Sequence, residues 1–202
     1  MGIKRPPYRL TDKILKYSNE ISRILGRYEG VALPKLPPKL RRKNRIKTIQ
    51  ASLEIEGNAL SEDQVTAILE DRRVIGSARD IREVQNSIVL YDMARDFKIH
   101  SEKDFLRAHR ILMEGLVESP GEFRSSGVGI VQGKKVIHMA PKAAMVPNLM
   151  DDLFNYLKSE PLDKLLIASS VFHYELEFIH PFMDGNGRMG RFCLLYTSPS
   201  PR

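Results

Sequence analysis

The chain has one cysteine and no long apolar run, and both shortages limit what it can be. Cys193 alone cannot form an internal disulfide, which disfavours a disulfide-stabilised secreted domain and fits a reducing compartment. No stretch approaches the ~20 apolar residues that a membrane-spanning helix needs. The first ten residues, MGIKRPPYRL, lack the apolar segment of a secretory signal. We therefore expect a cytoplasmic protein without membrane association.

Acidic residues are scarce in the first fifty positions. Residues 1–50 hold 14 Lys and Arg but 3 Asp and Glu, while the whole chain carries a net charge of +7. A basic arm of this kind can bind nucleic acid or an acidic partner. No aromatic interleaving or recognition motif accompanies the charge, so a solvated, lysine-rich helical face is the favoured interpretation.

Apolar residues recur at helical spacing along most of the chain, which indicates a mainly α fold. The pair Ser61 and Gln64 has the pattern of a capping box, with Leu60 and Val65 as a hydrophobic staple. One segment differs: GVGIVQGKKVIHMAP has two short β-prone runs and predicts a single hairpin. Helices are expected at 11–28, 40–56, 80–97, 102–117, 147–158 and 161–179, one starting near 61, and a last one from about 186 to 196.

Proline divides the chain into parts of unequal character. LPKLPPKL interrupts the helical pattern, so residues 1–40 should form an N-terminal helical arm and a proline-rich linker. A core that begins with a helix at about 41–57 should then occupy residues 41–196. Ser-Pro-Ser-Pro ends the last helix. We expect 197–202 to be a tail foreign to the natural protein, and the core to be truncated at its C-terminus.

The segment HPFMDGNGRMGR, at 180–191, combines groups that packing alone does not require. Gly185-Asn186-Gly187 can curl the backbone so that successive N–H groups form an anion-binding nest. A helix starting there would add its N-terminal N–H groups and dipole. Arg188 and Arg191, three residues apart, would share one face of its first turns. Together these groups suit a polyphosphate.

Two further side chains complete a possible reaction centre. Asp184 immediately precedes the nest, and one carboxylate with phosphate oxygens is a usual way to hold Mg²⁺. His180 closes the preceding helix, and an imidazole can accept a proton near neutral pH. The implied reaction is attack on a nucleotide phosphate by a hydroxyl that His180 deprotonates. The other histidines of the helical core, His100, His109 and His173, are interpreted as packed or hydrogen-bonded.

The twelve residues resemble the signature of the Fic family, His-x-Phe-x-Asp/Glu-Gly-Asn-Gly-Arg-x-x-Arg. Its fixed positions are all present: His180, Phe182, Asp184, Gly185, Asn186, Gly187, Arg188 and Arg191. The resemblance spans about 50–191 and implies a Fic-type helical core with one small β-hairpin flap. It also implies AMPylation, the transfer of AMP from ATP to a protein hydroxyl.

The resemblance assigns a role to each of these residues. It implies that His180 activates a target Ser, Thr or Tyr, and that Asp184 holds a Mg²⁺ bridging the α- and β-phosphates. The 185–187 backbone and Arg188 would hold phosphates, Arg191 would reach the γ-phosphate, and Phe182 would anchor the loop in the core. PGEFRSSGVGIV and VIHMAP resemble the flap, where Val136, Ile137 and His138 would pair with the target backbone.

An inward-pointing glutamate stands far upstream of the signature. On a helix, Ile49, Leu53 and Glu56 fall on one face, where an unpaired carboxylate is expensive, so Glu56 needs a cationic partner unless it bends out to water. Ser52-x-x-x-Glu56-Gly57 resembles the Fic inhibitory motif of the class with an N-terminal inhibitory helix. That resemblance implies that Glu56 pairs with Arg191, supported by Ser52, and blocks the γ-phosphate position.

The sequence is compatible with several functions. Removal of AMP, with Glu56 positioning a water, is not separated from AMPylation by the motif. The phosphorylating Doc branch departs from the Gly-Asn-Gly-Arg core, which favours AMP as the transferred group. A DNA-binding regulatory module has only the basic first fifty residues in its support. Self-modification is an open possibility, and an inhibitory helix docked on its own core is compatible with a monomer or a homodimer.

Overall fold

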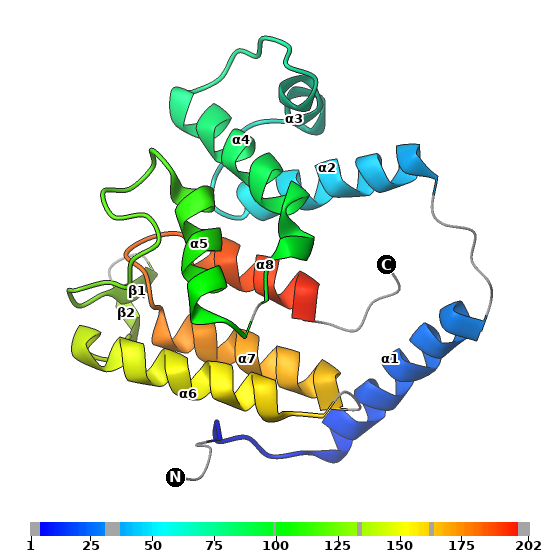
Figure 1. Cartoon of the computed structure of the whole chain (residues 1–202), viewed down its shortest axis with the longest axis vertical. Coiled ribbons are helices and arrows are strands. Elements are labelled where there is room, and N and C mark those ends of the chain that lie inside the picture. The colour runs from blue at the N-terminus through cyan, green and yellow to red at the C-terminus, as the bar shows by residue number, and fades with distance from the viewer. Residues whose placement is uncertain (1–4, 31–36, 99, 133–134, 162–163, 198–202) are drawn as a thin grey trace.

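Helices form nearly all of the regular structure, as the sequence predicts. The computed structural model describes residues 5–30, 37–98, 100–132, 135–161 and 164–197 (Figure 1). Its elements are α1 (Asp12–Gly30), α2 (Pro38–Glu54), α3 (Glu62–Leu69), α4 (Ala78–Asp92), η1 (Ala94–Asp96), α5 (Glu102–Met113), β1 (Gly129–Gln132), β2 (Lys135–Met139), η2 (Ala143–Met145), α6 (Val146–Ser159), α7 (Leu165–Ile179) and α8 (Asn186–Thr197). Within the described residues, none of the helices combines the length and apolar character needed to cross a membrane.

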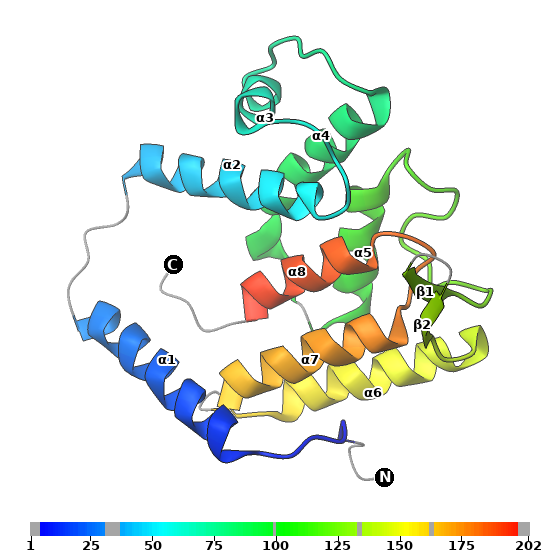
Figure 2. The ribbon, with the colours of Figure 1, turned by 180° about the vertical axis from the view of Figure 1, so that it is seen from behind.

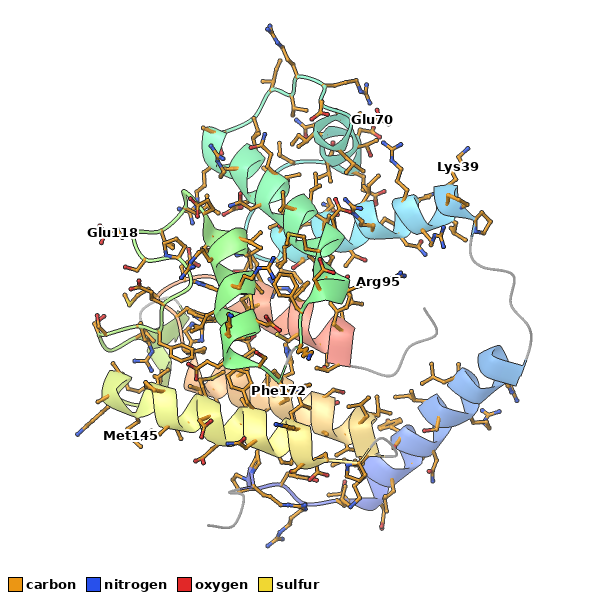
Figure 3. All side chains as sticks on the ribbon, in the orientation of Figure 1. Lys39, Glu70, Arg95, Glu118, Met145 and Phe172 are labelled. Atoms are coloured by element: carbon orange, nitrogen blue, oxygen red, sulfur yellow. The ribbon has the colours of Figure 1, made fainter. Side chains whose placement is uncertain are left out.

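The main core lies among α4, α5, α6, α7 and α8. In both views α6 and α7 lie side by side, and α8 packs along α7 (Figures 1 and 2). The core side chains are large and apolar, and each contributes about 1.5–3 kcal/mol when fully buried. They include Leu90, Phe105, Met113, Met150, Phe154, Phe172, Leu176, Met189 and Phe192. Phe172 stands where α7 faces the rest of this core (Figure 3). The core therefore holds α8, which carries the signature arginines, from several sides.

A second apolar cluster joins α2 and α3 to α4. The predicted stripe of α2 is buried there, because Ile49 and Leu53 are among its members. Val65 of α3 packs into the same cluster. The capping box is confirmed: the Gln64 N–H donates to the Ser61 hydroxyl, and the Ser61 N–H donates to the Gln64 side chain. This cluster fixes the direction of α2, whose C-terminal end reaches the signature.

Several helix boundaries differ from the prediction. α2 starts at Pro38, inside the expected linker, and ends at Glu54, with Gly57 at φ +90° in the turn that follows. α4 ends at Asp92, and α5 ends at Met113 instead of 117. Gly115 takes φ +71°, a left-handed value that an α-helix cannot continue through. At the C-terminal ends of α2, α4 and α5, the chain leaves the α-helix where periodicity alone would have extended it.

The hairpin and the basic arm lie at the edges of the core. β1 and β2 pair antiparallel within the predicted segment, with Gly129 opposite Met139. In the basic stretch, Arg42 lies 2.6 Å from Glu70 and Arg45 pairs with Asp92, so part of its charge is neutralised within the chain. Residues 31–36 of the linker, and 198–202 of the tail, fall outside the described residues.

Candidate functional site

The signature begins at the C-terminal end of α7. His180 closes that helix in a left-handed conformation, with φ +50° and ψ 64°. Its Nδ1 lies 3.3 Å from the Glu177 carbonyl oxygen, which can only accept a hydrogen bond. This contact assigns the proton to Nδ1 and leaves the lone pair on Nε2. The ring is therefore oriented so that Nε2 could accept a proton.

Phe182 anchors the loop in the core, as expected. Its side chain is fully buried and stacks on His109, with ring centroids 3.5 Å apart and planes 5° from parallel. Phe105 stacks on it as well, at 5.3 Å. These buried aromatic contacts tie the loop to the core.

His109 is buried and hydrogen-bonded, as the sequence suggested. Its Nδ1 accepts the Gly121 N–H at 2.9 Å, and its Nε2 lies 3.0 Å from the Asp184 carbonyl oxygen. Burial is the main cause of a low pKa for His109, about 4; the contact with Asp184 opposes it in part, and the nearby Arg188 adds to it. The ring is thus neutral, and it supports the backbone beside Asp184. His100 was also expected to be packed or hydrogen-bonded, but it is exposed.

Asn186 braces the loop with its side chain. Its amide accepts the Phe182 N–H and donates to the Phe182 carbonyl, both at 2.9 Å, and the residue is buried. Only its backbone remains for binding an anion. Gly185 takes φ +84°, and a Cβ there would lie 2.7 Å from the Met113 sulfur, so both conformation and space require glycine.

Glu56 pairs with Arg191, the partner that the inhibitory motif implies. Its Oε1 lies 2.5 Å from Arg191 Nη2, although 135 residues separate the two in sequence. Arg191 also donates to Ser52 twice, from Nε to the hydroxyl and from Nη2 to the carbonyl oxygen, each at 3.0 Å. A Cβ added to Gly187 would lie 2.6 Å from Glu56 Oε1. The carboxylate therefore rests directly on the first turn of α8, where N–H groups attract anions.

Arg188 points the other way, into the protein. Its Nη1 lies 3.1 Å from Glu83 Oε1 on α4, and its Nη2 lies 3.0 Å from Asp184 Oδ1. Glu83 is itself buried and also accepts from the Asn58 amide at 2.9 Å. Because Asn58 follows Glu56 by two residues, the turn after α2 touches both arginines, one directly and one through Glu83.

Asp184 has hydrogen-bond donors on both oxygens. Oδ1 accepts the Gly185 N–H at 2.6 Å and Arg188, while Oδ2 accepts Arg79 Nη2 at 3.2 Å. Burial alone would raise the pKa of Asp184, but Arg188, the Gly185 N–H and Arg79 outweigh it and hold the pKa below its usual value. The carboxylate is ionised at neutral pH.

This carboxylate fits a magnesium ion held jointly with a nucleotide. In the part of the chain that the structure describes, no three His, Cys, Asp or Glu side chains gather as a metal cage. Mg²⁺ usually keeps several waters and binds through one or two carboxylates plus substrate phosphates. A single ionised Asp184 beside an anion-binding helix end matches that donor set.

Arg124 is a further organising residue that the sequence did not reveal. It is buried, and its guanidinium donates to four backbone carbonyls: those of Ser126 and Pro141 at the base of the hairpin, and those of Ile179 and His180. The bond to the His180 carbonyl is 2.7 Å. Arg124 thus joins the hairpin to the left-handed turn at the end of α7.

Two residues of α4, Arg79 and Glu83, contact the signature but were not predicted from the sequence. α4 was expected only as a helix, yet Glu83, Asn86 and Ser87 are all buried on it. Polar residues on the buried face of a helix are a usable signal, because each needs a partner. Of the expected flap residues, Val136, Ile137 and His138 have their backbone in β2, and their side chains fall outside the described part.

Known proteins are similar to this chain in sequence and fold. Residues 99–197 match the model of the Fic/DOC family. The crystal structure of a Fic family protein from Desulfovibrio desulfuricans G20 superposes with a TM-score of 0.88 at 49% identity, covering 96% of this chain and 59% of that one. Fic-1 from C. elegans has a TM-score of 0.73 at 24% identity, over 91% of this chain and 56% of that one, which shows the fold alone.

Two relatives are named as protein adenylyltransferases. A probable protein adenylyltransferase of Aquifex aeolicus is 32% identical over 145 residues, which cover 71% of this chain and 44% of the relative. The protein adenylyltransferase Fic of Drosophila erecta is 35% identical over 158 residues, covering 72% of this chain and 30% of the relative. The chain thus spans less than half the length of either. Because the signature, the helices that frame it and these similarities agree, we conclude that the chain belongs to the Fic/DOC family.

Proposed function

We propose that this protein is an adenylyltransferase that moves AMP from ATP to a Ser, Thr or Tyr hydroxyl of a target protein, and that Glu56 restrains it. The observation that carries the proposal is the Glu56 carboxylate lying on Gly187 and Arg191. An anion in that place marks the N-terminus of α8 as an anion site. The names of the Aquifex and Drosophila relatives support AMP as the transferred group.

The reaction assigns His180 the role of general base. The target hydroxyl oxygen attacks the α-phosphorus of ATP, and the bond from that phosphorus to the oxygen bridging to the β-phosphate breaks. Pyrophosphate leaves, and the hydroxyl proton passes to His180 Nε2. The bond from Nδ1 to the Glu177 carbonyl supports this assignment, because it holds the ring in the tautomer whose Nε2 can accept.

The rest of the signature would bind the triphosphate. The backbone N–H groups of 185–187 and the guanidinium of Arg188 would contact the phosphates, and Arg191 would reach the γ-phosphate once free of Glu56. Asp184 would hold Mg²⁺, which neutralises phosphate charge when bound. The buried amide bonds of Asn186 keep this turn in shape before ATP arrives.

The hairpin would bind the target as an added strand. A two-stranded sheet leaves an edge where an extended segment can pair through its backbone, here beside Val136, Ile137 and His138. Arg124 supports this role, since it ties both ends of the hairpin to the carbonyl of His180. A target held on the hairpin would therefore be in register with the base.

Glu56 would inhibit by competition for Arg191. While the carboxylate rests on Gly187, the γ-phosphate cannot take the same place, and bound ATP would sit displaced. Misplacement of a reacting group by about 1 Å can lower a rate by ~10²-fold. The side chains of Glu56 and Arg191 are 31% and 25% exposed, so their ion pair can exchange with a phosphate.

The decisive test is the variant Glu56→Gly, assayed for transfer from ATP labelled at the α-phosphate, with Mg²⁺ and cell lysate. We expect labelling of a target, or of the protein itself, to rise by about 10²-fold as the γ-phosphate position becomes free. Glu54→Gly is the matched control, because Glu54 ends the same helix and bonds to Gln50. Equal labelling by wild type and Glu56→Gly would refute the inhibitory role.

Companion measurements separate the alternatives. In the Glu56→Gly background, His180→Ala should abolish transfer while ATP binding persists. Label from the γ-phosphate instead of the α-phosphate would indicate phosphorylation. If Glu56→Gly fails to raise labelling but stops the removal of AMP from a modified target, Glu56 serves the reverse reaction. Salt-dependent binding to duplex DNA with no label transfer would favour the regulatory module.

A further inference from the structure

Both oxygens of Asp184 accept hydrogen bonds. Oδ1 accepts the Gly185 N–H and Arg188, and Oδ2 accepts Arg79 at 3.2 Å. A carboxylate that binds a metal ion must present a free lone pair to it. Oδ1 accepts two bonds, whereas Oδ2 accepts one and keeps a lone pair that a cation could use. A cation at Oδ2 would be repelled by the positive charge of Arg79 beside the same oxygen, so displacement of a donor would favour its binding.

The three donors differ in how easily they can leave. The Gly185 N–H is a backbone group next to the carboxylate. The Arg188 side chain is 3% exposed and is held on its far side by the buried Glu83. The Arg79 side chain is 57% exposed, and its Nε lies 3.3 Å from Glu83, one turn further along α4. Arg79 can thus leave Oδ2 and keep a carboxylate partner.

We propose that Arg79 is a positioning residue that covers Oδ2 of Asp184 until a divalent cation and nucleotide arrive, and so sets the cation concentration that the site requires. The inference rests on the proposed function, because it takes Asp184 as the metal ligand. It goes beyond that function by adding a residue outside the signature, on α4. The cation would approach Oδ2, and Oδ1 would keep its bonds to Gly185 and Arg188.

The charges around Asp184 explain how Arg79 could affect cation binding at Oδ2. Arg79, Arg188, Asp184 and Glu83 form a group of two positive and two negative side chains linked by contacts of 3.0 to 3.3 Å. A divalent cation alone would add two positive charges to this balanced group. With a triphosphate present, its negative charge offsets that of the cation, and the bound cation would then repel Arg79 from Oδ2.

The test measures cation binding, with Mn²⁺ as the probe and the electron paramagnetic resonance signal of free Mn²⁺ as the readout. Protein is titrated in the presence of α,β-methylene-ATP, which cannot release AMP. Arg79→Ala should tighten Mn²⁺ binding by about two- to fivefold, the equivalent of a lost exposed ion pair. Arg82→Ala removes the same charge from an exposed position of the same helix and should change binding less.

Each outcome bears on the proposal. Mn²⁺ affinity that is unchanged or weaker in Arg79→Ala overturns it, as does an equal gain in Arg82→Ala, which would reflect overall charge. The double variant Arg79→Ala/Asp184→Asn should lose the gain. If Asp184→Asn alone binds Mn²⁺ as tightly as wild type, the metal role of Asp184 in the proposed function fails as well. If Asp184→Asn loses binding but Arg79→Ala does not tighten it, only the present inference fails.

Discussion

The two signature arginines on α8, Arg188 and Arg191, lie three residues apart and meet opposite surroundings. The Arg188 side chain is 3% exposed and lies between two carboxylates, one of them the buried Glu83. The Arg191 side chain is 25% exposed and is held by the end of α2, through Ser52 and Glu56. The same residue type thus makes a buried contact at one position and, at the other, a partly exposed contact that we expect to be exchangeable.

The difference shows how one helix can carry both a buried and a partly exposed ion pair. Breaking a buried ion pair strands a charge, whereas breaking a partly exposed one leaves both groups hydrated. We therefore expect Arg188 to keep its contacts with Glu83 and Asp184 when ATP binds. Around Arg191, we expect the partner to change.

Substitutions of Arg188 and Arg191 should differ most in how much they lower the free energy of unfolding. Arg188→Met leaves Glu83 buried with only Asn58 and Arg79 as partners, and losing one member of a buried pair typically lowers stability by about 3–5 kcal/mol. Arg191→Met should lower it by less than about 1 kcal/mol, as for an exposed pair. Urea unfolding followed by circular dichroism measures both. Similar losses in the two variants would show that the two surroundings do not differ as described.

Acid should destabilise the fold through His109, which supports the backbone beside Asp184. The pKa of His109 falls from 6.5 to about 4 on folding, so the unfolded chain takes up a proton first as the pH drops. The stabilisation is complete above pH 6.5 and is lost as the pH falls toward 4, by about 3 kcal/mol in total. His109→Gln, which keeps polar groups but does not titrate, should lose less stability over that range in pH-dependent unfolding. Parallel curves for the two proteins would exclude this role.

The smallest effect concerns the support of the exchangeable contact. Ser52→Ala removes the hydroxyl that accepts from Arg191 Nε and leaves the carbonyl and Glu56 contacts in place. A hydrogen bond contributes about 0.5–1.5 kcal/mol, so transfer from labelled ATP should rise only about two- to tenfold. Thr48→Ala, one turn earlier, loses a hydroxyl bonded to Asn44 of its own helix and serves as control. A rise as large as that of Glu56→Gly would make Ser52 the main restraint.

Local features of the fold could be predicted from the sequence because their partners are close in the chain. The capping box of α3 involves residues three apart, and the buried stripe of α2 repeats at helical spacing. The predicted C-terminal ends of α4 and α5 lay too far along the chain, because the spacing of apolar residues does not show where a turn ends a helix. Glu83 and Arg79 escaped notice because their contacts with the signature span 105 residues.

The sequence by itself determined which groups can bind an anion, hold a metal ion and accept a proton, because those properties belong to residue types at short spacing. Together with the inhibitory motif, it also indicated that Glu56 would need a cation. Only the tertiary structure decided that Arg188 is buried against Glu83, that Arg79 covers Asp184, and that Arg124 joins the hairpin to His180. Those contacts depend on how whole helices pack, and packing follows from the shape of the entire core, not from any one segment.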